Sequence, residues 1–171
     1  MKRRVVITGI GVIAPNGIGK ENFWKALTGG KSGIKKITSF DASELPVQIA
    51  GEVTDFKPED YIEDRKKLRR MARFSQFAVA CAKMAIEDSG LNLKEIDSEK
   101  ILVCLGVSTS AMDLIESQYR KFLNKGYRGI VPFGIFSATP NMACQEILNE
   151  FLLEVPISTV ASGCAAGLEA I

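Results

Sequence analysis

Three short apolar runs, each followed by glycine or other small residues, constrain the fold of this chain more than any other feature. The runs are RVVITGI at 4–10, ILVCL at 101–105 and PISTV at 156–160. Each has the length of a β-strand, and a continuous apolar run without alternation is typical of a strand buried on both faces. Segments with helical spacing separate the runs, and this alternation predicts an α/β domain.

Helical periodicity is strongest over residues 69–88, where an apolar face continues until a Ser-Gly pair ends the pattern. A second pattern at 20–27 stops at a Gly-Gly pair, which is typical of a helix C-terminus. The remaining predictions are helices through 114–122 and over 140–151, a strand at 47–53, a helix start at 57–60 and an unfinished helix at 165–171.

The composition indicates a single globular domain over residues 1–171. Hydrophobic residues make up 46% and charged residues 25% of the chain, which is enough apolar mass for a core. No apolar run is as long as a membrane span or resembles a signal-peptide core. We therefore expect a cytoplasmic protein whose cysteines are free thiols.

Cys164 lies between the third predicted strand and the last predicted helix, among small residues. A cysteine in this position meets unpaired backbone N–H groups and the positive end of a helix dipole, which stabilise the thiolate. Its own backbone N–H can also contribute to an oxyanion hole. From the pattern alone, the simpler interpretation is favoured, in which Cys164 is a small buried residue at a packing joint.

The other cysteines, Cys81, Cys104 and Cys144, fall on helix faces or within a strand, and we expect them in the core. No CxxC pair or other metal-ligand spacing occurs, so we expect no metal site. The chain contains no histidine. It therefore cannot by itself activate a nucleophile through a Cys-His pair.

A basic cluster occupies residues 65–73. By itself such a cluster is more often a solvated helix face, and the alternative is docking of an acidic partner. Nucleic acid is not expected, because the net charge is only +2 and no aromatic residues alternate with the cations. The members are Arg65, Lys66, Lys67, Arg69, Arg70 and Arg73.

Residues 9–14 fit the glycine pattern of a dinucleotide-binding turn, because they follow a predicted strand. Pro15 and Asn16 interrupt the helix that such a turn requires. No acidic residue closes a second strand about 20 positions later. We therefore do not expect a dinucleotide site.

Five sequence blocks, taken together, resemble the N-terminal half of the elongating β-ketoacyl-acyl-carrier-protein synthases. They are RRVVITGIGVIAPNG, FWKALTGGKSGI, RRMARFSQFAVACAKMAIEDSGL, VPFGIFSATPNMA and ASGCAAGLEAI, in the order of that family. The resemblance implies an α/β, thiolase-like layered fold in which a mixed sheet has helices on both faces. It also implies that only the N-terminal half is present and that the chain stops just after the nucleophile.

The resemblance implies that Cys164 is the catalytic nucleophile and takes the acyl chain as a thioester. In the family, a pair of histidines and a lysine from the other half assist decarboxylation of malonyl-carrier, and the resulting carbanion attacks the thioester. This decarboxylative Claisen condensation elongates fatty acids. We therefore expect an acyltransferase that is inactive as this chain alone, because the half with those residues is absent.

The resemblance also implies partners and binding residues. We expect a homodimer that receives its substrates on the phosphopantetheine arm of acyl carrier protein, with no other cofactor, no nucleic acid and no membrane. Strand 157–160 would pair with its copy in the dimer. The implied acyl-pocket residues are Thr109, Phe133 and Phe136, and the implied carrier-docking residues are Lys66, Arg69 and Arg70.

Two alternatives stay open because several positions depart from the family pattern, among them Ala72, where an aspartate is common. One alternative is a non-catalytic ketosynthase-like subunit that sets chain length for another subunit. The other is an inactive fragment of a split gene.

Overall fold

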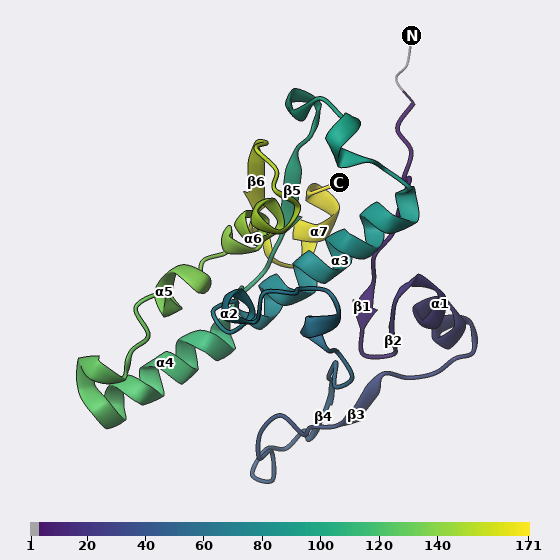
Figure 1. The fold of residues 1–171 in the computed structure, drawn as a ribbon. Helices are drawn as coiled ribbons and strands as arrows, with labels where there is room; N and C mark the ends of the chain where they lie inside the picture. Colours follow the sequence, from purple (N-terminus) through teal and green to yellow (C-terminus); the bar gives the residue numbers. More distant parts are fainter. Residues whose placement is uncertain (1–3) are drawn as a thin grey trace. The chain divides into compact units, whose positions relative to one another are not determined.

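The computed structural model describes residues 4–171, which form two compact units (Figure 1). The described part of the first unit comprises residues 4–57 and 81–91, and the second unit comprises residues 58–80 and 92–171. Helix α3, Arg73–Ser89, contributes its first turns to the second unit and its last turns to the first. No helix among residues 4–171 has the length and apolar character needed to cross a membrane.

The first unit contains two small antiparallel sheets and one helix. Strand β1, Ile13–Ala14, pairs with β2, Gly17–Ile18, and β3, Ile34–Lys36, pairs with β4, Ile49–Gly51. The predicted strand at 47–53 is therefore confirmed in shortened form, whereas β3 was not predicted. Helix α1, Lys20–Thr28, confirms the helix predicted at 20–27 and is closed by a glycine C-cap.

The prediction of a buried strand at residues 4–10 is wrong for this structure. No strand among residues 4–171 includes this run, and Val5 and Ile7 are 90% and 74% exposed. A strand requires a neighbour whose N–H and C=O groups complete its ladder. The run has no such neighbour within the described residues, so its apolar composition alone does not make it a strand.

The glycines at positions 9 and 11 have a packing role against the end of α3. A side chain at Gly9 would place Cβ 2.1 Å from the Ala85 carbonyl oxygen, and one at Gly11 would place it 1.9 Å from the Cys81 carbonyl oxygen. The hairpin of β1 and β2 follows at once, where a dinucleotide site would need a helix. Close packing against α3 therefore explains why glycine occupies positions 9 and 11, and no nucleotide-binding role is needed.

The second unit is built on a parallel pair of strands. Strand β5, Val103–Gly106, pairs with β6, Ile157–Val160, in a register that runs from Val103 opposite Ile157 to Gly106 opposite Val160. This pair confirms the strands predicted at 101–105 and 156–160. The helices of the unit are α2 (Arg65–Leu68), α4 (Met112–Lys125), α5 (Gly134–Ser137), α6 (Met142–Phe151) and α7 (Ala166–Glu169), with short 3-10 turns at Pro58–Asp60, Leu93–Glu95, Ser98–Lys100, Gly126–Gly129 and Gly163–Ala165.

The helix predicted over 69–88 corresponds to α3, which begins only at Arg73; residues 69–72 separate it from the short helix α2. Met71 and Ala72 are buried in this break. The Gln76 side-chain amide donates to the carbonyl oxygens of Leu68 and Met71, both at 3.3 Å, and so satisfies acceptors that a continuous helix would have paired. The prediction is therefore confirmed for α3 from residue 73 onward and wrong for residues 69–72, which are not helical.

The core of the second unit lies where helix α6 packs on strands β5 and β6. Ala143 and Cys144 are completely buried, and the Cys144 sulfur lies 3.5 Å from the Ser158 carbonyl oxygen. A second buried cluster joins Ala72, Ala111 and Ala138. Among the described residues the parallel and antiparallel pairs lie in separate two-stranded sheets.

Candidate functional site

Cys164 lies in the short 3-10 turn Gly163–Ala165, between the end of β6 and the start of α7. Gly163 has φ of +66°, a left-handed conformation that glycine adopts without a Cβ clash. The Cys164 residue is exposed. The interpretation of Cys164 as a buried packing residue is therefore wrong for this structure.

Contacts with α7 and β5 hold the turn around Cys164 in place. The Ser162 hydroxyl donates to a carboxylate oxygen of Glu169 at 2.6 Å, which closes the turn onto α7. Ala166 is buried, and its carbonyl oxygen would lie 2.2 Å from a Cβ at Gly106. Only a glycine in β5 allows this approach, so the sequence holds the start of α7 directly against the end of β5.

The carboxyl ends of both parallel strands therefore meet at the Cys164 turn. Gly106 ends β5 and pairs with Val160, which ends β6. The segment 107–111 leaves the sheet at the same edge as Cys164. Loops at the carboxyl ends of parallel strands are where α/β proteins most often bind ligands.

The segments that carry the predicted acyl-pocket residues lie together in the structure. The Ser110 hydroxyl donates to the Ala138 carbonyl oxygen at 2.9 Å, and Ala111 and Ala138 share one buried cluster. The three predicted pocket side chains themselves are exposed, with Phe133 at 54% and Phe136 at 65%. Their role as pocket residues, and that of Thr109, stays a prediction.

The predicted docking residues Lys66, Arg69 and Arg70 are all exposed. Arg69 donates from Nε to the Arg65 carbonyl oxygen at 3.2 Å, which leaves its terminal amino groups at the surface. The Arg70 guanidinium lies 5.2 Å from the centre of the Phe133 ring. No pattern in the sequence predicts this cation–π contact, which joins a predicted docking residue to a predicted pocket residue.

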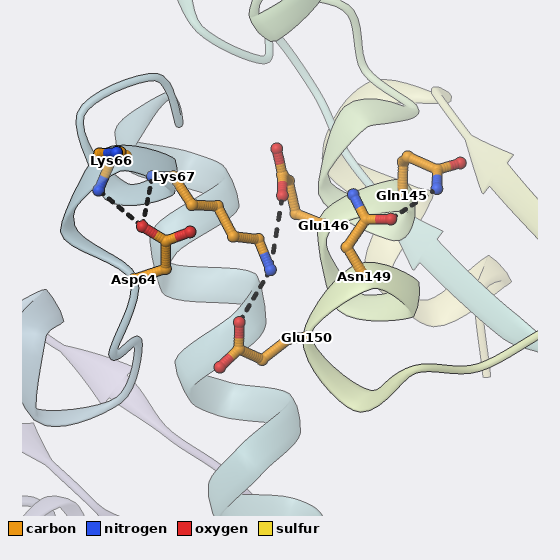
Figure 2. Close-up of polar contacts among 7 residues, drawn as sticks. All are labelled: Asp64, Lys66, Lys67, Gln145, Glu146, Asn149 and Glu150. Atoms are coloured by element: carbon orange, nitrogen blue, oxygen red, sulfur yellow. Dashed lines mark hydrogen bonds and ion pairs between the residues drawn. The ribbon is translucent and has the colours of Figure 1, made fainter.

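Lys67 differs from its neighbours in the basic cluster. Its side chain is 20% exposed, and its Nζ lies 2.8 Å from Glu150 Oε2 and 3.9 Å from Glu146 Oε2 (Figure 2). Burial raises the pKa of Glu146 despite the opposing charge of Lys67. Sequence analysis missed the pair of Lys67 and Glu150, because its members are 83 positions apart in the chain.

The other cysteines are less accessible than Cys164. Cys144 is buried, while Cys81 and Cys104 are partly buried. Burial raises the pKa of the Cys81 thiol, which disfavours the reactive thiolate. Their predicted placement in the core is confirmed for Cys144 and holds in part for the other two.

A pocket of about 470 Å³ lies in the first unit. It contains none of the predicted site residues. Its lining is mainly apolar and is formed by Ile10, Val12, Lys20, Glu21, Phe23 and Trp24.

Comparisons with known proteins show the family to which the chain is related. The sequence matches the family described as "Beta-ketoacyl synthase, N-terminal domain" over residues 2–171. It is 43% identical over 170 residues to the 3-oxoacyl-[acyl-carrier-protein] synthase 2 of Coxiella burnetii (strain RSA 493 / Nine Mile phase I), an alignment that covers 99% of this chain and 41% of that protein.

Two solved structures show the likeness of fold. The ishigamide ketosynthase/chain length factor has a TM-score of 0.86 at 30% identity, and the match covers 95% of this chain and 40% of that chain. A type II PKS acyl-carrier protein in complex with its ketosynthase has a TM-score of 0.78 at 20% identity, over 99% of this chain and 44% of that one. The predicted α/β, thiolase-like fold class is confirmed.

The chain thus spans 41% of the length of the Coxiella relative. The resemblance found in the five sequence blocks is confirmed by the family match along almost the entire chain. The chain belongs to the β-ketoacyl synthase family and carries the N-terminal domain of that family.

Proposed function

We propose that this chain is the acyl-accepting part of a β-ketoacyl-acyl-carrier-protein synthase that elongates fatty acyl chains. One observation carries the proposal: Cys164 is exposed in a constrained turn at the carboxyl edge of the parallel strands. The name of the Coxiella relative supports the same reaction class.

In the first step, the Cys164 sulfur attacks the carbonyl carbon of an acyl thioester on acyl carrier protein. A new C–S bond forms to Cys164, the bond to the phosphopantetheine sulfur breaks, and the proton of the cysteine passes to the departing thiol. The backbone N–H of Cys164 would stabilise the oxyanion of the tetrahedral intermediate. Covalent capture divides one difficult condensation into two easier steps.

In the second step, malonyl-carrier loses carbon dioxide, and the electron pair of the broken C–C bond forms the carbon nucleophile. This carbanion attacks the acyl-Cys164 carbonyl, a C–C bond forms, and the cysteine leaves and is reprotonated. The chain contains no histidine. The histidine pair and lysine that the family uses for decarboxylation would therefore act from outside these residues.

The partners follow from the same proposal. Lys66, Arg69 and Arg70 would meet the acidic acyl carrier protein, and rim charges of this kind mainly raise the association rate. The acyl chain would extend along Thr109, Phe133 and Phe136. The protein would act in the cytoplasm as a homodimer, in which strand β6 pairs with its copy.

Acylation can be tested by intact-mass measurement after incubation with an acyl-carrier thioester. We expect a mass increase of one acyl group in the unmodified protein and in Cys81→Ala, and no increase in Cys164→Ala. Circular dichroism should first show that all three proteins are folded. A folded protein that acquires no acyl group, or a Cys164→Ala protein that still acquires one, would reject the proposal.

A second candidate function is a non-catalytic subunit that sets chain length. The likeness to the ishigamide ketosynthase/chain length factor favours keeping it. In that case Cys164→Ala would leave the length and yield of a partner ketosynthase's product unchanged. Loss of product in that variant would exclude this candidate.

A further inference from the structure

The basic cluster at residues 65–73 divides into two kinds of side chain. Lys66 and Arg69 extend from exposed positions, whereas the Lys67 side chain is only 20% exposed. Sequence alone gives no reason for this difference, since Lys66 and Lys67 are adjacent and identical in type. The structural neighbours of Lys67 supply the reason.

Lys67 reaches from α2 to two carboxylates on one face of α6 (Figure 2). Its ammonium group lies 2.8 Å from Glu150 Oε2, and the Glu150 side chain is 20% exposed. The second carboxylate, Glu146, is 14% exposed and lies 3.9 Å away. Partly buried pairs of this kind are screened less by salt than surface pairs are.

Helix α2 needs such an external contact because it is only four residues long. A helix of one turn does not hold itself together in water. The Asp64 side chain accepts from the backbone N–H groups of Lys66 and Lys67, at 2.8 and 3.2 Å, and fixes the start of the helix. Gln76 satisfies the carbonyl group of Leu68 at its end.

Helix α6 provides a firm base for this contact. Four of its ten residues, Ala143, Cys144, Ile147 and Leu148, are buried. It packs on β5 and β6, and β6 leads directly into the Cys164 turn. The ion pair of Lys67 therefore connects α2 to the packed layer that carries the candidate nucleophile.

We infer that Lys67 is a positioning residue that holds α2 on α6 and thereby fixes Lys66 and Arg69 for docking of an acidic carrier protein. The inference rests on the proposed function, because it needs a carrier that docks at this cluster. Lys67 does not itself bind the carrier. Its ammonium already faces Glu146 and Glu150, whose negative charge would repel an incoming acidic group.

A substitution of Glu150 distinguishes the positioning role of Lys67 from simple electrostatic attraction between the basic cluster and the carrier. Removing a carboxylate makes the surface more positive, so simple attraction predicts that Glu150→Gln binds an acidic carrier at least as well as the unmodified protein. The positioning role predicts the opposite, because Glu150→Gln removes the partner that holds Lys67. Glu63→Gln is the matched control, since Glu63 is an exposed acidic residue near α2.

The experiment compares acyl transfer to Cys164 from two donors, the acyl-carrier thioester and the same acyl group on coenzyme A. For the carrier donor, we expect Lys66→Gln, Arg69→Gln, Lys67→Met and Glu150→Gln each to raise the half-saturating concentration roughly 3- to 10-fold. In Lys67→Met and Glu150→Gln, the maximal rate with either donor should stay unchanged. Lys67→Arg should restore carrier binding, and Glu63→Gln should not weaken it.

Hydrogen exchange over residues 64–70 tests the positioning step without any carrier. Exchange should be faster in Lys67→Met and Glu150→Gln and unchanged in Lys67→Arg and Glu63→Gln. Unchanged carrier binding in Glu150→Gln, with weakened binding in Lys66→Gln and Arg69→Gln, would overturn the inference and leave the proposed function standing. Unchanged binding in all four variants would overturn the docking surface and the inference with it.

Discussion

Strand β5 and the segment 4–10 are both short and mainly apolar, yet only β5 forms a strand in this structure. Strand β5 is paired in parallel with β6 and covered by α6. The segment 4–10 belongs to no strand among the described residues, and its side chains are largely exposed. The difference lies in their neighbours, because only β5 has both a hydrogen-bonding partner and a helix above it.

The comparison shows that composition gives a segment the capacity for β-structure, while pairing decides whether the capacity is used. The two units also differ in how their strands are paired. The second unit has a parallel pair with a packed helix on it, whereas the first has only two short antiparallel pairs among its described residues. Substitutions in the two units should therefore differ in their effect on stability.

The largest effect is expected for Leu148→Ala in α6, because this side chain is buried against the paired strands. Truncation leaves a cavity and should lower the free energy of unfolding by about 3 kcal/mol. Ile7→Ala is the matching substitution in the unpaired segment 4–10. It should change the free energy of unfolding by less than about 0.5 kcal/mol, because Ile7 is 74% exposed. Urea unfolding measures both. A large loss from Ile7→Ala would break the comparison by showing that the segment is buried in solution.

A smaller effect is expected for Gly11→Ala in the first unit. The new Cβ would collide with the Cys81 carbonyl oxygen, and the backbone must move, at a cost of about 2 kcal/mol. Gly167→Ala is the control, because nothing lies within 4 Å of its Cβ position. That change should be neutral or stabilising by about 0.5 kcal/mol. Equal losses at the two glycines would contradict the packing seen at Gly11.

Glu146 in the second unit and Glu52 in the first should contribute to the pH dependence of stability with opposite signs. Burial raises the pKa of Glu146 in the folded state, so the folded protein binds this proton more tightly than the unfolded chain does. Its contribution is present at low pH and is lost as pH rises through the folded pKa. Glu146→Gln should therefore gain stability relative to the unmodified protein as the pH of a urea titration is raised. No change in slope would argue against the burial of Glu146.

Glu52 should give the smallest effect, with the reverse sign. Hydrogen bonds from the side chains and backbone of Ser39 and Thr38 lower its pKa to about 2. Its stabilising contribution is present above the pKa of the unfolded chain and is lost as pH falls through about 2. Acid unfolding can be followed by circular dichroism, with urea added so that both proteins have the same free energy of unfolding at neutral pH. Under these conditions the unmodified protein should begin to unfold at a higher pH than Glu52→Gln. Identical acid profiles would show that these hydrogen bonds do not persist in solution.

Much of the fold could be predicted from local patterns in the sequence. The helices α1, α4 and α6 and the strands β5 and β6 follow from apolar periodicity and from the small residues that end each element. The place of Cys164 between β6 and α7 could be predicted for the same reason. These features depend on near neighbours in the chain.

The features that were missed depend on residues distant in the sequence. The break between α2 and α3 is stabilised by the Gln76 side chain, and the periodicity of 69–88 carries no sign of it. The ion pair between Lys67 and α6 joins residues 83 positions apart. The exposure of Cys164 likewise depends on how β5, β6 and α7 meet, so the pattern alone could not choose between a buried and a reactive cysteine.

The contact of Arg70 with the Phe133 ring has a consequence for how this protein can be dissected by mutation. Because one side chain covers the other, truncating Phe133 also releases the guanidinium, and truncating Arg70 also uncovers the ring. Neither single variant reports on one residue alone. A double-mutant cycle over the two positions is required to separate the proposed role of Arg70 in carrier docking from the proposed role of Phe133 in the acyl pocket.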